Sequence, residues 1–304
     1  MLPRIVFMGS PEFALSALQA LHDNFTVVGV VTQPDRPSGR GRTLKPPAIK
    51  SLSQELGIPL IQPKRLREPD AMQQLQAWRP DVIIVAAYGQ ILKPAVLDLP
   101  LHGCVNMHAS LLPRWRGASP IQAAILHGDS ETGITIMRMD PGMDTGPILS
   151  QRAVLIHSDD TAGTLSPLLS GLGGELLLET LPAYLDGEIP PQPQDDTLAT
   201  KAPLLKKSDG LLDFTHPADE LERQVRAYNP WPGAFMYWKN QPLKIHRSQV
   251  VNRPVNTPGK LIIYEKLPAI STSDGLLVLE EVQPAGKKSI PGLTFLNGAR
   301  GWGE

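Results

Sequence analysis

Residues 4–33 read "RIVFMGSPEFALSALQALHDNFTVVGVVTQ", and this stretch decides the fold class. Its two ends, 4–10 and 26–33, are apolar, β-branched runs that close in small or turn-forming residues, as strands buried on both faces do. The middle, 11–24, has the apolar spacing of a helix with a proline in its first turn. A strand, a helix and a strand in this order predict a βαβ unit.

The pattern continues outward from this unit. Residues 81–89 and 133–140 read as further strands, and 48–58 and 69–78 carry helical spacing. This alternation predicts an α/β fold in which an open, mostly parallel, Rossmann-like sheet has helices on both faces. In such sheets ligands bind beyond the carboxyl ends of the strands.

The turn after the first strand, "MGSPEF", invites comparison with a dinucleotide site. That fingerprint needs G-x-G-x-x-G, whereas only Gly9 is present. We therefore expect no nicotinamide, flavin or other nucleotide cofactor, and we interpret Gly9 as permitting a tight turn.

The chain of 304 residues favours two domains. We predict a first domain over 1–190, which ends in a helix beginning near 173, and a Pro- and Gln-rich linker over 191–207. Short strand-like segments, closely divided by Gly, Pro and Asn, predict a small antiparallel β-barrel of the OB-like type over 208–304. The final "GARGWGE" shows no evident structure.

Composition narrows the class of protein. Hydrophobic residues make up 41% and charged residues 19%, which indicates a soluble globular chain with material for a core. The apolar runs are too short to span a bilayer and the start lacks a signal peptide, so we expect a cytoplasmic protein, taken as a monomer. Cys104 is the single cysteine, which excludes an internal disulfide and multi-cysteine metal sites, and we interpret it as a core residue.

Charge is unevenly divided along the chain. Residues 1–205 hold 16 Lys and Arg against 20 Asp and Glu, whereas 206–304 hold 13 against 10, so the net charges are -4 and +3. A basic tail on an acidic body weakly indicates a polyanionic partner.

Residues 106–117, "NMHASLLPRWRG", follow an apolar strand-like run. Asn106 and His108 are two residues apart, so they share one face of a strand and place an amide donor beside an imidazole. The alternative for 111–117 is a surface loop with solvated arginines and a partly covered Trp115.

A second polar cluster, "DPGMDTGPIL" at 140–149, carries two acids in a Gly- and Pro-rich loop. Asp144 is the candidate partner for His108, because a carboxylate near an imidazole stabilises its charged form and orients it. The alternative is that Asp140 or Asp144 only caps the turn. Spacing alone leaves both alternatives open.

Asn106-x-His108, "SLLPRWRG" and "GMDTG", in this order, resemble the folate-dependent formyltransferases, which place an Asn, a His and an Asp at these motif positions. Within that family, "TQPDRPSGRGR" at 32–42, "QPAGKKS" at 283–289 and the barrel-like tail are similar to the members that act on methionyl-tRNA. The similarity runs through nearly the whole chain.

The resemblance implies transfer of a formyl group from 10-formyltetrahydrofolate, a co-substrate, to the α-amino group of initiator methionyl-tRNA. The substrate amine is the nucleophile, so no metal is implied. Asn106 and protonated His108 would stabilise the oxyanion, and Asp144 would keep His108 charged and help to accept a proton.

The resemblance also implies binding residues. Those for folate are Tyr88, Gly89, Ile91, Ser110, Leu111, Leu112 and Pro113. The basic loop over 33–50 and the basic tail suggest nucleic-acid contacts, with Arg40 at the family position for the acceptor end of the tRNA. The tRNA-binding set is Arg36, Arg40, Arg42, Lys45, Lys206 and Lys207. An exposed basic loop without a partner is the alternative.

Three rival functions stay open. Glycinamide ribonucleotide formyltransferases use the same three residue types but normally lack a second domain. Amino-sugar formylation is a further rival. An RNA-binding protein with an inactive formyltransferase fold would bind tRNA with steep salt dependence and move no formyl group.

Overall fold

The structure is a computed structural model that describes residues 2–38 and 43–303. The chain forms two compact units. The first unit comprises Met1–Gly117, Thr132–Val154 and Ser166–Lys201, and the second comprises Ala118–Glu131, Leu155–Leu165 and Ala202–Glu304. Each unit is described by itself below.

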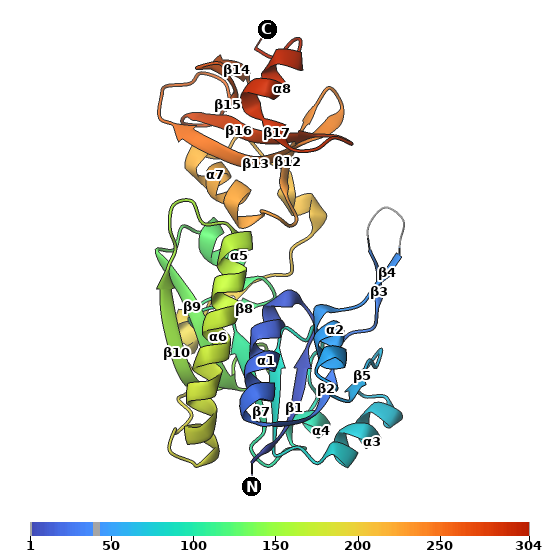
Figure 1. The fold of residues 1–304 in the computed structure, drawn as a ribbon. Coiled ribbons are helices and arrows are strands. Elements are labelled where there is room, and N and C mark those ends of the chain that lie inside the picture. Colours follow the sequence, from blue (N-terminus) through green and yellow to red (C-terminus); the bar gives the residue numbers. More distant parts are fainter. Residues whose placement is uncertain (1, 39–42, 304) are drawn as a thin grey trace. The chain divides into compact units, whose positions relative to one another are not determined.

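The first unit is built on a seven-stranded sheet in the order β10-β9-β7-β6-β1-β2-β5 (Figure 1). Its strands are β1 (Arg4–Gly9), β2 (Thr26–Val31), β5 (Leu60–Ile61), β6 (Val82–Ala86), β7 (Cys104–His108), β9 (Glu131–Arg138) and β10 (Ile148–Leu155). Strands β1, β2, β5, β6 and β7 pair in parallel, whereas β9 pairs antiparallel with β7. The predicted open, mostly parallel sheet is confirmed.

Helices cover both faces of this sheet. They are α1 (Leu15–Asn24), α2 (Ala48–Glu55), α3 (Pro69–Trp78), α4 (Pro94–Leu97) and α6 (Ala162–Leu185). Trp78 of α3 and Val96 of α4 belong to one apolar cluster with Met8 and Val85 of the sheet. On the other face, Ser170 of α6 donates a 2.9 Å hydrogen bond to Ser16 of α1. The two helix layers bury the sheet from both sides, as its continuous apolar strands require.

Helix α6 begins eleven residues before the predicted start at 173 and contains Pro167 and Pro182. The two glycines in its middle, Gly171 and Gly173, differ in their surroundings. A Cβ atom on Gly173 would lie 2.4 Å from Sδ of Met107 on β7, whereas one on Gly171 would meet nothing within 4 Å. Glycine at 173 therefore lets the helix approach the central strands.

This contrast gives a matched pair of substitutions. Gly173→Ala is expected to lower the free energy of unfolding by about 1–3 kcal/mol, because Met107 is buried and must shift. Gly171→Ala is expected to raise it by about 0.5–1 kcal/mol, because alanine favours a helix where space is open. Urea unfolding of both variants checks this, and equal effects in the two would contradict it.

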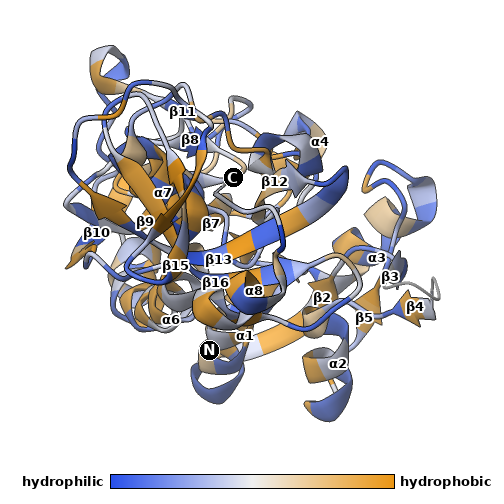
Figure 2. Ribbon diagram, turned by 90° about the horizontal axis from the view of Figure 1, so that it is seen from above, coloured by the Kyte–Doolittle hydropathy of each residue, from blue (hydrophilic) through white to orange (hydrophobic). Residues whose placement is uncertain are grey.

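The second unit contains an antiparallel sheet in the order β12-β13-β16-β15-β14, with β17 paired to β16. Its strands are β12 (Ala234–Trp238), β13 (Gln241–Val251), β14 (Leu261–Tyr264), β15 (Leu267–Ser271), β16 (Leu276–Pro284) and β17 (Ile290–Pro291). Its helices are α5 (Pro120–Leu126), α7 (Ala218–Ala227), α8 (Gly292–Gly298) and the 3-10 turn η3 (Lys207–Gly210). Figure 2 shows hydrophobic segments in many strands, alternating with hydrophilic segments along β13, and many hydrophilic connecting loops.

Residues 298–303 are structured, contrary to the expectation for "GARGWGE". Trp302 is 3% exposed, its indole donates to the carbonyl of Ile262 at 3.0 Å, and its ring meets Phe295 edge to face. A single large aromatic residue therefore closes the core of the second unit, in a segment for which the sequence showed no evident structure.

Gly9 serves a different purpose from the one predicted. Its φ is not positive, and a Cβ atom there would lie 2.7 Å from the ring of Phe7 and 2.9 Å from the carbonyl of Ala86. The structure gives a steric reason for this glycine, because a side chain would collide with the ring of Phe7, the carbonyl of Ala86 and the Cβ of Ala14.

None of the helices within residues 2–38 and 43–303 combines the length and hydropathy needed to span a bilayer. The remaining short elements are β3 (Arg36–Ser38), β4 (Thr43–Lys45), β8 (Arg116–Gly117), β11 (Lys201–Ala202), η1 (Glu12–Ala14) and η2 (Asp196–Leu198). Strand β3 pairs with β4, and β8 pairs with β11.

Cys104, at the start of β7, is 1% exposed, and burial raises the pKa of its thiol to about 12. At pH 8 roughly one molecule in 10⁴ then carries the thiolate. We expect the folded protein not to react with Ellman's reagent at pH 8, and the unfolded chain to release one equivalent of thionitrobenzoate. Rapid labelling of the folded protein would contradict a core position for this side chain.

Candidate active site

Asn106 and His108 lie at the carboxyl end of β7, and both are buried, with 8% and 6% of their surfaces exposed. The pairing sets Asn106 beside Val85 of β6 and Met137 of β9. Alternation along the strand turns Met107 to the α6 face and leaves Asn106 and His108 together on the other. The two side chains share a face, as their spacing predicts.

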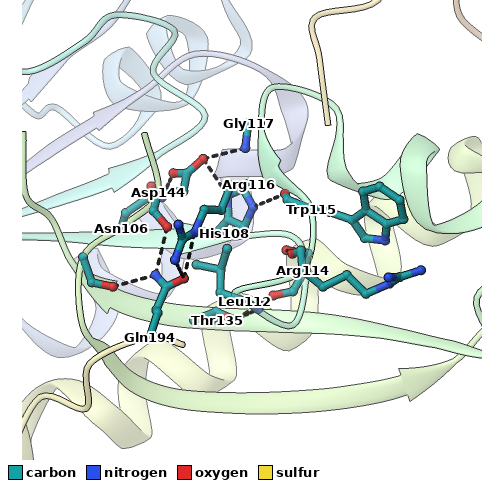
Figure 3. Close-up of polar contacts among 12 residues, drawn as sticks. Asn106, His108, Leu112, Arg114, Trp115, Arg116, Gly117, Thr135, Asp144 and Gln194 are labelled. Carbon is teal, nitrogen blue, oxygen red and sulfur yellow. Dashed lines mark hydrogen bonds and ion pairs between the residues drawn. The ribbon is translucent and has the colours of Figure 1, made fainter. Parts of the chain in front are cut away.

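Asp144 reaches the same place from the loop between β9 and β10. Its Oδ2 accepts a 2.9 Å hydrogen bond from the amide of Gly117 and lies 3.7 Å from Nδ1 of His108. Its Oδ1 is 3.5 Å from Nδ2 of Asn106 (Figure 3). The structure therefore brings the amide, the imidazole and the carboxylate together from two separate segments.

The two acids of the 140–146 loop behave differently. Asp140 Oδ1 accepts hydrogen bonds from the amide of Gly142 at 2.9 Å and the hydroxyl of Thr145 at 2.6 Å, so it caps the turn. Asp144 has a φ of +52°, which aspartate tolerates better than most residues. A Cβ on Gly146 would lie 1.9 Å from the carbonyl oxygen of Arg138, which explains that glycine.

The ring of His108 is oriented by the main chain. Its Nε2 lies 3.0 Å from the carbonyl oxygen of Trp115. Because a carbonyl only accepts, Nε2 carries a hydrogen, and Nδ1 is the nitrogen turned toward Asp144. The 3.7 Å between Nδ1 and Oδ2 exceeds a hydrogen bond, so neither atom is saturated by the other.

The loop that supplies this carbonyl is not a solvated surface loop. Trp115 is 5% exposed, has a φ of +61° and lies under the guanidinium of Arg114, 4.4 Å from its ring centre. A bulky residue in the left-handed region is strained, and such strain persists only where the surroundings fix it. The conformation of Trp115 fixes the position of its own carbonyl, which is the group that orients His108.

The residues predicted to bind folate differ in accessibility. Ser110, Leu112 and Tyr88 are buried, Leu111 and Pro113 are partly buried, Gly89 is exposed, and Ile91 is 71% exposed. The amide of Leu112 donates to Thr135 Oγ1 at 3.0 Å, and its carbonyl accepts from Gln151 at 2.9 Å. Much of the polar backbone of this loop is therefore already engaged inside the protein.

Next to Ile91 lies a cavity of about 330 Å³ that sequence reasoning missed. Its lining combines apolar side chains with three cations: Arg65, Leu66, Arg67, Met72, Gln90, Ile91, Lys93, Ala95 and Val96. Gln90 accepts a 3.1 Å hydrogen bond from the amide of Leu66 and so ties two walls together. The cationic run at 64–67, just before α3, was the available signal.

The residues predicted to bind tRNA fall into three groups. Arg40 and Arg42 lie outside the described residues. Arg36 and Lys45 face each other across the β3–β4 pair, and Lys206 and Lys207 are exposed in the second unit.

The foot of the basic loop is anchored. Lys50 forms a 2.8 Å ion pair with Asp35, so it is not a free cation of this loop. Hydrogen bonds from Gln62 and then Lys50 hold the pKa of Asp35 below its ordinary value.

The chain is similar to known proteins along nearly its whole length. Residues 3–181 match the family described as Formyl transferase, and residues 204–300 match Formyl transferase, C-terminal domain. A methionyl-tRNA formyltransferase of Myxococcus xanthus is 49% identical over 297 residues, covering 97% of this chain and 95% of that protein. One of Roseiflexus sp. is 50% identical over 301 residues, with 98% and 93% covered.

Among solved structures, the sugar 3N-formyl transferase WlaRD, determined in the presence of dTDP and 5-N-formyl-THF, has a similar fold. Its TM-score is 0.69 at 19% identity, over 95% of this chain and all of that one. With both family domains in order and relatives about half identical over nearly its whole length, this chain belongs to the formyl transferase family.

Proposed function

We propose that this formyltransferase moves the formyl group of 10-formyltetrahydrofolate to the α-amino group of methionyl-tRNA. The observation that carries the chemistry is the convergence of Asn106, His108 and Asp144 at the carboxyl edge of the sheet. The choice of amine is supported by full-length relatives named methionyl-tRNA formyltransferase.

The reaction needs a polar site that stabilises charge. The amine nitrogen attacks the formyl carbon, the carbonyl electron pair moves to oxygen, and the bond between that carbon and N10 of the folate then breaks. The attacking nitrogen loses one proton and N10 gains one, so the products are the formamide and tetrahydrofolate. The enzyme has to stabilise the oxyanion and carry the proton.

Asn106 and His108 suit the oxyanion. Among the residues that the structure describes, Nδ2 of Asn106 makes one hydrogen bond, a long one of 3.5 Å to Asp144, and Nδ1 of His108 lies 3.7 Å from that acid. Both groups can therefore turn a hydrogen toward a substrate oxygen at little cost. Their burial strengthens this interaction, because surrounding water is scarce.

Asp144 is suited to accept the proton that the attacking amine loses. A carboxylate has about four acceptor sites, and Asp144 uses one fully for the amide of Gly117 and one loosely for Asn106. The remaining acceptor capacity faces His108, whose Nδ1 lies 3.7 Å from Oδ2 of Asp144. The same oxygen can take the proton of the attacking amine, directly or through water.

The cavity beside Ile91 supports the identity of the donor. A reduced folate has a flat heterocycle, an aromatic spacer and a glutamate with two carboxylates. Apolar walls from Leu66, Met72 and Val96 suit the rings, and cations from Arg65, Arg67 and Lys93 suit the carboxylates.

We assign 1–190 to catalysis, 191–207 to the connection and 208–304 to tRNA binding. The family matches at 3–181 and 204–300 support this division. Lys206 and Lys207 are exposed at the end of the connection, where they can contact phosphates. Arg36, Arg40, Arg42 and Lys45 form the other proposed contact.

The test is to supply the enzyme and 10-formyltetrahydrofolate with methionyl-tRNA, glycinamide ribonucleotide and a nucleotide-linked amino sugar in parallel. Mass spectrometry of each amine follows the formyl group. We expect formylation of the methionyl-tRNA alone. Preferred formylation of either small amine would refute the proposed substrate, and tight tRNA binding without transfer would identify an inactive binder.

A further inference from the structure

Residues 192–201, which we call the strap, lie against the candidate active site although the sequence places them in the linker. Gln192 exchanges backbone hydrogen bonds of 2.7 and 2.8 Å with Ile148 of β10. Thr200 Oγ1 accepts a 2.9 Å bond from the amide of Trp115, and its carbonyl accepts from the amide of Arg116 at 2.9 Å. The strap therefore joins β10 to the 113–117 loop.

One side chain in the strap connects two walls of the site. Nε2 of Gln194 donates to the carbonyl oxygens of Asp144 at 2.8 Å and Gly146 at 2.7 Å. Oε1 of the same amide accepts from Arg116 Nε at 3.0 Å and Nη2 at 2.8 Å (Figure 3). Both donors and the acceptor of Gln194 are thus used, and no smaller side chain spans these groups.

The groups that Gln194 holds are those that fix the reacting side chains. Asp144 has a left-handed backbone, so its carbonyl needs a partner to keep that conformation. Arg116 lies between Trp115, whose carbonyl orients His108, and Gly117, whose amide binds Asp144. The link from Arg116 through Gln194 to the backbone of Asp144 therefore sets the distance between the 113–117 loop and the 140–146 loop.

We propose that Gln194 is a positioning residue for formyl transfer, which holds the 140–146 loop against Arg116 so that Asp144 faces Asn106 and His108. This inference rests on the proposed roles of those three residues. Gln194 touches neither substrate in this account. It acts on the rate of the chemical step by fixing the geometry of Asp144.

Gln194→Glu is the sharpest test, because it keeps the shape and the acceptor for Arg116 but sets a carboxylate oxygen against two carbonyl oxygens. A shift of the loop by an ångström is expected to lower kcat by about 10²-fold. The KM values for both substrates are expected to stay within about threefold of wild type, because binding is not the affected step.

Two further variants complete the design. Gln192→Glu makes the same chemical change in the same strap. Within the described part of the chain the Gln192 side chain bonds to the carbonyl of Pro190 at 3.2 Å and to no other group, so wild-type kcat is expected. Gln194→Ala removes the bridge without adding charge, and we expect it to lower kcat in the same direction. Thermal melting of each variant shows whether it is folded.

The outcomes separate the inference from the proposed function. If folded Gln194→Glu and Gln194→Ala keep wild-type kcat while Asp144→Asn is inactive, the positioning role is wrong and the function stands. An equal loss in Gln192→Glu, or a change confined to the KM for tRNA, also overturns it. If wild type forms no formylmethionyl-tRNA, the proposed function itself has failed.

Discussion

Replacing Asp144 by Asn is expected to abolish most formyl transfer and to leave the fold intact. Asparagine tolerates the φ of +52° and keeps an oxygen for the amide of Gly117. It removes the charge that faces His108 and the acceptor for the amine proton. Loss of general acid–base catalysis is expected to lower the single-turnover rate by about 10²–10⁴-fold.

The measurement is rapid quench with saturating enzyme and folate, followed by detection of formylmethionine on the tRNA. Asp140→Asn is the matched control, since it makes the same change four residues away and keeps an acceptor for the amide of Gly142. We expect a much smaller loss there. A nearly normal rate for Asp144→Asn in a folded protein would refute the role assigned to this carboxylate.

The second large effect is expected at Asn106. Asn106→Ala removes the side-chain amide, which donates a hydrogen bond whatever the pH. Loss of a single oxyanion donor typically lowers kcat by about 10²–10³-fold. The KM for the formyl donor should change little, because the interaction forms mainly in the transition state. Steady-state kinetics over a range of both substrates checks this split.

Met107→Leu is the control for Asn106→Ala, because it changes the neighbouring residue on the opposite face of β7. The two side chains have similar volumes, so we expect stability to fall by less than about 1.5 kcal/mol and kcat to be preserved. If Asn106→Ala lowers stability alone and retains its rate, the amide is a structural group and the oxyanion assignment is wrong.

Much of the fold could be predicted from local pattern. In the βαβ unit at 4–33 the spacing of the apolar residues indicates two strands and a helix, and β1, α1 and β2 form there. The start of α6 could not be predicted, because Pro167 and the glycines at 171 and 173 signal a break in isolation. The close approach to Met107 explains Gly173, and the hydrogen bond from Ser170 to Ser16 holds the helix against α1, and neither contact is local.

The candidate site was predictable to the extent that its members are close in sequence or share a motif. Asn106 and His108 follow from strand alternation, and Asp144 from the family pattern. Gln194 carries no local signal, since it is one of two glutamines in a proline-rich stretch and meets Asp144 fifty residues earlier in the chain. The basic cavity wall at 65–67 was visible as charge, but its partner at Lys93 depends on how α3 and α4 fold onto β6.

The strap has a consequence for how members of this family can exchange parts. A recombinant junction placed at 190 would pair one parent's Arg116 and Asp144 with the other parent's Gln194, whereas a junction after 201 would inherit all three together. Chimaeras with the later junction should therefore keep their turnover when the C-terminal part comes from another parent. The strap belongs with the active-site residues and not with the C-terminal part that follows it.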